Sequence, residues 1–345
     1  MKQNQLSLYH CLLSIVLLTI LIGCIRFGTQ TPDSTAYIAL TEFFKGTRDT
    51  LPPAPFAFRI LPAIITAILP IERIETAYAI MSLVFTVCAY FLFIILLDRF
   101  KLDAQTKSIA LFLMVFSFPT VNYSSRVLTD AVGFFLLTIS FIFLVSYRYY
   151  FFVIAVAIGV MAREANLVIL PVLWFYYVAA KKYNFPHRPS IYHMLVSLAP
   201  LVIVVAIRYI FREAGHYIWV FSLPHMLSKF RIDTVSTFAL TILPPLLLIL
   251  YGYFYGSARK IISLQMIKSS RLVFFTVSYT LLCIVLIIYS TLTACISGRF
   301  VWPIYLTLIP FTAIAIRDTW IERKLILPVS GFLFPCQTEQ LKKID

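Results

Sequence analysis

Apolar runs separated by short polar stretches occupy most of the 345-residue chain. A helical run of about 20 apolar residues matches the thickness of a bilayer core. The runs cover residues 8–27, 76–97, 109–121, 131–146, 149–162, 165–180, 191–211, 237–254, 272–292 and 300–316. We therefore predict an all-α, polytopic membrane protein with about ten transmembrane helices.

The apolar block 149–180 is interpreted as two spans. A single helix rises about 1.5 Å per residue, so one helix of this length would extend far beyond a bilayer core of about 30 Å. We expect the chain to fold back near residues 163–166, where Arg163 and Glu164 interrupt the apolar pattern.

The stretch 28–75 is the longest polar interruption, and we interpret it as the first loop outside the membrane. A helix is predicted over residues 34–44, and it can begin on a cap at Asp33 or at Ser34. Its side chains at i and i+4 share one face, so Tyr37 lies on the same side as Asp33.

A second apolar piece of this loop, residues 56–69, is too short to cross a bilayer, and we expect Pro62 to break it. Both loop helices suit a position in the membrane interface. The predicted organisation is a transmembrane domain over residues 1–320 and a short cytoplasmic tail over 321–345.

Composition places the chain in the membrane class. Hydrophobic residues make up 61% of it, charged residues 13%, and the mean hydropathy is +0.90. The formal net charge is +14, but the lysines and arginines are scattered between apolar runs and form no basic stripe with interleaved aromatic residues. This distribution predicts contact with membrane lipids and no nucleic-acid partner.

The cysteines and histidines show no metal or disulfide pattern. Six cysteines are present, without CxxC or Cys/His ligand spacing. We expect no cofactor; a divalent metal is compatible with the chemistry below, but nothing in the sequence supports one.

Basic residues between the apolar runs predict the orientation. If the amino terminus is cytoplasmic, most basic loops lie on the cytoplasmic side, where the loops of membrane proteins carry an excess of lysine and arginine. These residues are Arg99, Lys101, Lys107, Arg148, Lys181, Lys182, Arg188, Arg259, Lys260, Lys268 and Arg271. Both termini are then cytoplasmic, and the loop 28–75 lies outside.

This topology brings several ionisable residues to the outer ends of the spans. An ionisable side chain near the hydrocarbon core is expected to be paired or to face a polar cavity. The residues are Asp33, Arg59, Asp130, Arg163, Glu164 and Arg299. Simpler roles stay open, because Arg163 and Glu164 can form a local ion pair, and Asp130 or Asp33 can cap a helix.

Asp33 and Tyr37 are the candidate catalytic residues. Tyr37 is spaced to orient the Asp33 carboxylate by a hydrogen bond. A carboxylate at a membrane surface can deprotonate a hydroxyl group while nearby arginines hold a phosphate leaving group. Sugar transfer from a lipid phosphate would need this chemistry.

Short motifs in this order resemble the GT-C superfamily of multispanning glycosyltransferases, and in detail bacterial membrane proteins assigned to cell-surface glycopolymer formation. The motifs are Pro-Asp-Ser-x-x-Tyr at 32–37, Pro-Phe-Ala-Phe-Arg-Ile-Leu-Pro at 55–62, Leu-Thr-Asp-Ala at 128–131, Ala-Arg-Glu-Ala at 162–165, Leu-Pro at 170–171 and Gly-Arg-Phe-Val-Trp-Pro at 298–303.

The resemblance implies a GT-C-like fold, a polyprenyl-phosphate sugar donor, a catalytic Asp33 and a donor phosphate at Arg299. Many members carry paired acidic residues in the first loop and a soluble carboxy-terminal domain. Here Asp33 stands alone at its corner, and only the short tail 321–345 follows the last span. An acceptor that needs a docking domain is therefore not expected.

We predict an inverting glycosyltransferase in a bacterial cytoplasmic (inner) membrane, with its active site on the outer face. It would transfer a sugar from a polyprenyl-phosphate-linked donor to a glycan or lipid acceptor of the cell envelope. Arg59, Arg163 and Arg299 are candidates to bind the donor phosphate, and Asp130 and Glu164 are further candidates for substrate binding. The alternatives are a transporter or flippase for lipid-linked glycans and a non-catalytic component of a glycopolymer assembly complex.

Overall fold

The structure is a computed structural model that describes residues 2–183, 185, 187–215, 230–255, 271–293 and 297–322. Within these residues every regular element is a helix. Five helical segments are long and apolar enough to cross a membrane: Ile74–Arg99, Ile191–Ile210, Ile232–Gly252, Arg271–Thr293 and Gly298–Arg317. The described part of the chain is thus all-helical, with the helices of an integral membrane protein. The predicted tail 321–345 lies almost entirely outside the described residues.

Each of the ten predicted apolar runs contains a helix. The corresponding elements are α1 (Lys2–Gly23), α4 (Ile74–Arg99), α5 (Ala104–Val115), α7 (Asp130–Val145), α8 (Tyr149–Ala162), α9 (Leu170–Tyr183), α10 (Ile191–Val196) with α11 (Ala199–Ile210), α13 (Ile232–Tyr255), α15 (Arg271–Thr293), and α16 (Gly298–Val301) with α17 (Tyr305–Glu322). Because several are shorter than a bilayer core requires, ten crossings remain a prediction.

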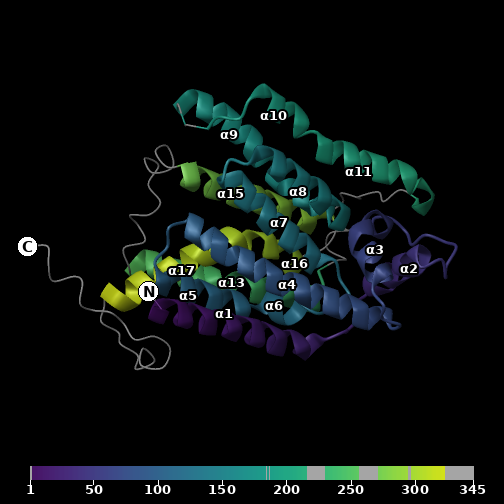
Figure 1. The fold of residues 1–345 in the computed structure, drawn as a ribbon, viewed down its shortest axis with the longest axis horizontal. Coiled ribbons are helices and arrows are strands. Elements are labelled where there is room, and N and C mark those ends of the chain that lie inside the picture. The colour runs from purple at the N-terminus through teal and green to yellow at the C-terminus, as the bar shows by residue number, and fades with distance from the viewer. Residues whose placement is uncertain are drawn as a thin grey trace, which may run out of the picture.

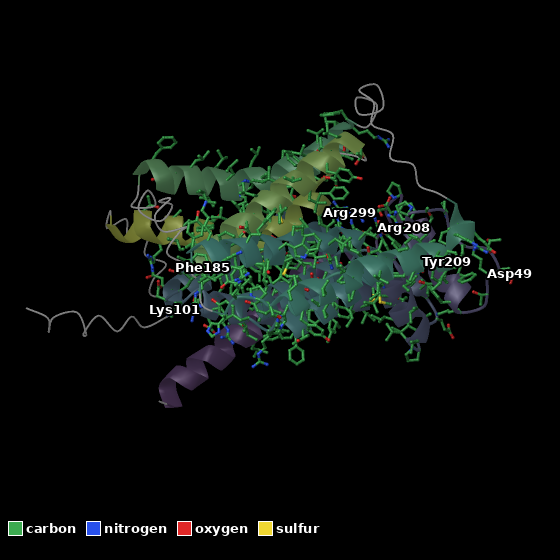
Figure 2. All side chains as sticks on the ribbon, turned by 90° about the horizontal axis from the view of Figure 1, so that it is seen from above. Asp49, Lys101, Phe185, Arg208, Tyr209 and Arg299 are labelled. Carbon is green, nitrogen blue, oxygen red and sulfur yellow. The ribbon has the colours of Figure 1, made fainter. Side chains whose placement is uncertain are left out.

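The long helices lie roughly along the longest axis of the molecule, with α1 on one side of the bundle and α10 and α11 on the opposite side (Figure 1). The small helices α2 and α3 gather at one end. Figure 2 shows Lys101 and Phe185 toward one end of the molecule, Tyr209 and Asp49 toward the other, and Arg299 between them.

The predicted fold-back after α8 is confirmed. The helix ends at Ala162, and Arg163 has an extended backbone (φ −161°, ψ 120°) before the short 3₁₀ helix η3 (Glu164–Ile169). At the far end, the Tyr149 hydroxyl at the start of α8 donates to the carbonyl oxygen of His187, at 2.5 Å, beyond the end of α9. The chain therefore reverses at Arg163.

The run 109–121, predicted as one helix, is divided. An Asp103 cap accepts a hydrogen bond from the Thr106 N–H at 3.0 Å and starts α5 earlier than expected. α5 ends at Val115, and a new helix, α6 (Phe118–Tyr123), begins with Pro119 in its first turn. Proline suits that position because the N–H it lacks would have no helical partner there.

The first loop forms α2 (Ser34–Phe44), the 3₁₀ helix η2 (Phe56–Phe58) and α3 (Ile60–Ile68). The bounds of α2 match the prediction. The expected break at Pro62 is wrong: Pro62 lies in the first turn of α3, where a missing N–H is tolerated, and the break falls at Arg59 instead.

Asp103 also anchors the end of the bundle where many basic loop residues lie. It forms an ion pair with Arg317 of α17, and Lys107 pairs with Asp98 across the turn between α4 and α5. Burial alone would raise the pKa of Asp103, but hydrogen bonds from Thr106 and the charge of Arg317 outweigh it, so its pKa is lowered. Arg259, Lys260 and Lys268 of the predicted basic side lie outside the described residues.

Aromatic packing holds the start of the last helical segment inside the bundle. Trp302, in the 3₁₀ helix η6 (Trp302–Ile304), stacks on Phe134 of α7 with ring centroids 4.7 Å apart. The Tyr279 hydroxyl of α15 donates to the Pro303 carbonyl oxygen at 2.9 Å. These contacts position Arg299, which lies three residues before Trp302, beside the start of α7.

Candidate functional site

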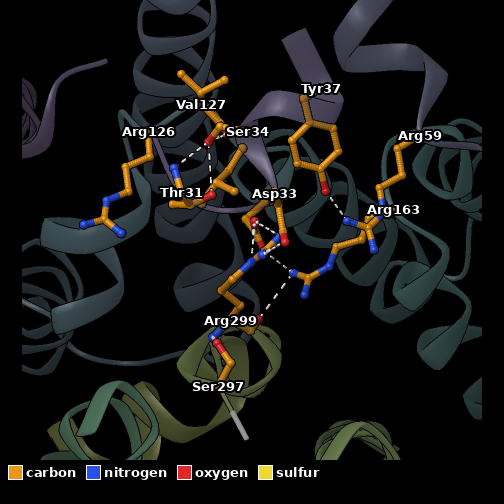
Figure 3. Close-up of polar contacts among 12 residues, drawn as sticks. Thr31, Asp33, Ser34, Tyr37, Arg59, Arg126, Val127, Arg163, Ser297 and Arg299 are labelled. Atoms are coloured by element: carbon orange, nitrogen blue, oxygen red, sulfur yellow. Dashed lines mark hydrogen bonds and ion pairs between the residues drawn. The ribbon is translucent and has the colours of Figure 1, made fainter. Parts of the chain in front are cut away.

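Four ionisable residues from distant segments form one continuous network (Figure 3). Arg299 bonds to Asp33 through Nη1, and to Asp130 Oδ2 through Nε at 3.0 Å and Nη2 at 2.9 Å. Arg163 Nη1 lies 2.6 Å from the other Asp130 oxygen, Oδ1. Asp33, Asp130, Arg163 and Arg299, all predicted site residues, therefore meet in space.

Exposure rises along this network. The Asp130 side chain is fully buried, and the side chains of Arg163, Arg299 and Asp33 are 6%, 17% and 32% exposed. Buried arginines beside a buried carboxylate have reduced hydration, so their charges interact more strongly than at a surface. Asp33 is thus the most exposed end of the network.

Neither carboxylate is used as a helix cap. Asp33 occupies the N-cap position of α2 and Asp130 is the first residue of α7, yet no side-chain capping bond is formed at either helix start. Both carboxylates are directed to arginines instead. The structure therefore does not support the helix-capping roles that the sequence left open for Asp33 and Asp130.

Ser34 fixes the corner that carries Asp33. Its hydroxyl donates to the Val127 carbonyl oxygen at 2.9 Å and accepts from the Thr31 N–H at 2.7 Å (Figure 3). The corner is thus tied to the segment that leads into Asp130. This anchoring hydroxyl was missed at the sequence level, although Ser34 was considered as a cap.

Arg163 is held by the close approach of α7 and α8. A Cβ atom on Gly133 would lie 3.2 Å from the Arg163 Cβ, so the missing side chain leaves room for the arginine. Arg163 Nη1 also donates to the Arg299 carbonyl oxygen at 3.3 Å, and its guanidinium carbon lies 5.3 Å from the centre of the Phe300 ring. Arg163 thus joins α8 to α16.

Tyr37 has a different partner from the one predicted. Its side chain is fully buried, and its hydroxyl accepts a hydrogen bond from Arg59 Nη1. Among the described residues no hydrogen bond joins the Tyr37 hydroxyl to Asp33. The Arg59 guanidinium also lies over the Phe56 ring at 5.7 Å, and its Nε is buried without a hydrogen-bond partner. Tyr37 therefore positions Arg59.

Glu164 lies outside the network. Its Oε1 accepts from Arg208 Nε at 3.1 Å and from Arg208 Nη2 at 2.9 Å. The local pair with Arg163 left open from the sequence is thus replaced by a contact with α11. Arg208, at half exposure, was not singled out from the sequence, because only the packing of α11 on α8 brings it to Glu164.

The balance of charge favours an anion. Three guanidinium groups, of Arg59, Arg163 and Arg299, face two carboxylates, of Asp33 and Asp130, which leaves one positive charge in excess. Arginine forks match phosphate oxygens well. In the part of the chain that the structure describes, no group of three or more His, Cys, Asp and Glu side chains is placed to hold a metal ion.

Gly298 permits the close contact that places Arg299. A Cβ atom at 298 would touch the Thr241 hydroxyl and lie 2.6 Å from the Thr237 carbonyl oxygen of α13. Because backbone cannot yield as a flexible side chain does, we expect Gly298→Ala to lower the free energy of unfolding by about 1–3 kcal/mol. Thermal denaturation in detergent measures this, and an unchanged melting temperature would contradict the contact.

Comparison with known proteins adds no family assignment to this geometry. No protein-family model, no curated protein and no solved structure matches the chain.

Proposed function

We propose that the protein is an inverting membrane glycosyltransferase that transfers a sugar from a polyprenyl-phosphate donor to a glycan or lipid acceptor of the cell envelope. The observation that supports this most strongly is the partly exposed Asp33 carboxylate at the end of the buried Asp130, Arg163 and Arg299 network. It combines a reachable base with fixed cations, which are the two groups that sugar transfer from a phosphate requires.

The proposal includes the membrane setting. About ten spans in a GT-C-like arrangement would carry the site at the outer face of a bacterial cytoplasmic membrane, with both termini in the cytoplasm. Lys101, in the basic turn between α4 and α5, lies far from Asp49 of the first loop (Figure 2), which supports this orientation because lysine and arginine prefer cytoplasmic loops.

The reaction is a single displacement. The acceptor hydroxyl oxygen attacks the anomeric carbon of the donor sugar, and its proton passes to the Asp33 carboxylate. The bond between the anomeric carbon and the phosphate oxygen breaks, and its electron pair leaves with the polyprenyl phosphate. Attack from the side opposite the phosphate inverts the configuration.

Arg299 connects the base to the leaving group. In this structure its guanidinium bonds both Asp33 and Asp130. A donor phosphate would compete with Asp33 for Arg299, while Asp130 keeps the guanidinium in place. Binding of the donor would thereby release Asp33 to accept a proton and would stabilise the charge that develops on the leaving phosphate.

Arg59 and Arg163 are the additional phosphate candidates. Arg59 has an unpartnered buried Nε, so it has hydrogen-bonding capacity that the protein does not use. Arg163 is more restricted because Asp130 and the Arg299 carbonyl oxygen already engage it. We therefore rank Arg59 ahead of Arg163 for direct contact with the donor, and we rank Arg299 first because a phosphate can replace Asp33 on its Nη1.

The test uses the full chain reconstituted in lipid vesicles with labelled polyprenyl-phosphate sugars and a cell-envelope lipid extract as acceptor. We expect transfer of label, and a loss of about 10²–10³-fold in kcat for Arg299→Gln, the scale for removing one preorganised donor at a developing charge. Arg48→Gln is the matched control, because it alters an exposed arginine of the first outer loop that pairs with Glu42.

Absence of transfer with every donor would reject the proposal. Movement of labelled lipid across the vesicle bilayer without transfer would identify a transporter or flippase. If neither occurs, a non-catalytic role in an assembly complex is the remaining alternative.

A further inference from the structure

Two chain segments near the site run side by side, and each of them carries an arginine. The Gly28 N–H donates to the Ser125 carbonyl oxygen at 3.0 Å, and the Val127 N–H donates to the Thr29 carbonyl oxygen at 3.4 Å. Arg26 and Arg126 belong to these paired segments. Arg26 ends the 3₁₀ helix η1 (Cys24–Arg26), which directly follows α1.

Arg26 and Arg126 have no acidic partner in the part of the chain that the structure describes. Across the described residues, no ion pair joins Arg26 or Arg126 to a carboxylate, and the buried Nε of Arg126 has no hydrogen-bond partner. Burial lowers the pKa of Arg126, and repulsion from Arg26 and Arg299 lowers it further. An anion between these guanidiniums would relieve the repulsion and supply the missing acceptor.

Val127, the residue after Arg126, accepts a hydrogen bond from the Ser34 hydroxyl at 2.9 Å, which places this segment beside the corner that carries Asp33. The Arg126 side chain itself points away from Asp33 (Figure 3). An anion held there would therefore be separate from the phosphate assigned to Arg299 and close enough to present a bound molecule to Asp33.

An exposed apolar face leads to this pair. Leu13, Leu17 and Leu21 recur every four residues along α1, and Ile25 continues the row to Arg26; all four are exposed. Figure 1 shows α1 at the outer edge of the bundle. A hydrocarbon chain can lie along this face with a phosphate at its end. In the proposed orientation Arg26 and Arg126 are outside, where loop arginines are otherwise disfavoured, which also argues for a specific anion.

We infer that Arg26 and Arg126 bind the phosphate of a second polyprenyl lipid, whose chain lies along α1 and whose head group carries the acceptor. The role as acceptor rests on the proposed function; the lipid-phosphate site itself does not. The acceptor would then be a lipid-linked saccharide that enters the site from the membrane.

The test measures binding without sugar transfer. Native mass spectrometry of the detergent-purified full chain is carried out with a sugar-free polyprenyl monophosphate. We expect two bound lipids per chain in the wild type. Arg299→Gln and the double variant Arg26→Gln, Arg126→Gln should each lose one of them, with at least a tenfold rise in the dissociation constant for that site. Arg73→Gln, which alters an exposed arginine of the first outer loop, should keep both.

Two bound lipids in the double variant would overturn the inference. Dioleoyl phosphatidylglycerol that displaces the polyprenyl phosphate from that site as well as the polyprenyl phosphate itself does would also overturn it, because the site would then bind anionic lipids in general. If the double variant fails to fold, the single variant Arg26→Gln serves, because Arg26 is exposed and contributes little to packing. Two-lipid binding without transfer would reject the proposed function alone.

Discussion

Replacing Asp130 with asparagine is expected to lower the free energy of unfolding by about 3–5 kcal/mol, the scale for removing one partner of a buried ion pair. Asp130 is fully buried and accepts contacts from both Arg163 and Arg299. Asparagine has nearly the same shape, so little packing is lost. The loss arises because two buried guanidiniums are left with no neutralising charge between them.

Thermal and chemical denaturation of the detergent-purified protein measure this effect. Asp98→Asn is the matched control, since Asp98 pairs with Lys107 at an exposed position where a pair contributes about 0–1 kcal/mol. A double-mutant cycle with Arg163→Gln separates the pair from other effects. If Asp130→Asn and Asp98→Asn lowered the free energy of unfolding by the same small amount, the buried ion pairs of Asp130 would contribute no more to stability than an exposed pair.

Asp33→Asn is expected to lower kcat for sugar transfer by about 10²–10⁴-fold, the range for a general base. Stability should change little, because Asp33 is about one third exposed and Arg299 keeps its bonds to Asp130. The KM for the donor should stay the same or fall, since Arg299 no longer has to exchange Asp33 for the phosphate. This split between kcat and KM distinguishes a base from a residue that only shapes the site.

Steady-state transfer in vesicles at several donor concentrations measures both constants. Asp49→Asn, another carboxylate of the first outer loop that is exposed, is the control and should retain wild-type transfer. Undiminished transfer by Asp33→Asn would remove Asp33 from the mechanism. A rise in KM alone would reassign it to donor binding.

The segment around Asp33 shows which features the spacing of residues along the sequence can predict. The bounds of α2 follow from the apolar spacing and its polar start, and the grouping of Asp33 with Asp130, Arg163 and Arg299 follows from counting spans. The hydrogen-bond partners of Tyr37 and Glu164 could not be predicted in this way. Their partners, Arg59 and Arg208, come from elements whose packing against α2 and α8 no spacing along the chain reveals.

The sequence by itself determined the helices and their class, because a bilayer demands long apolar runs whose backbone hydrogen bonds stay inside each segment. It also identified which charged residues stand near the ends of those runs. Only the tertiary structure decided which of them pair, because the contact of Arg299 with Asp33 spans 266 residues and depends on how α2, α7 and α16 pack together. The pairing of the segments around Arg26 and Arg126 likewise depends on that packing, since charge patterns along the chain carry no information about distance in space.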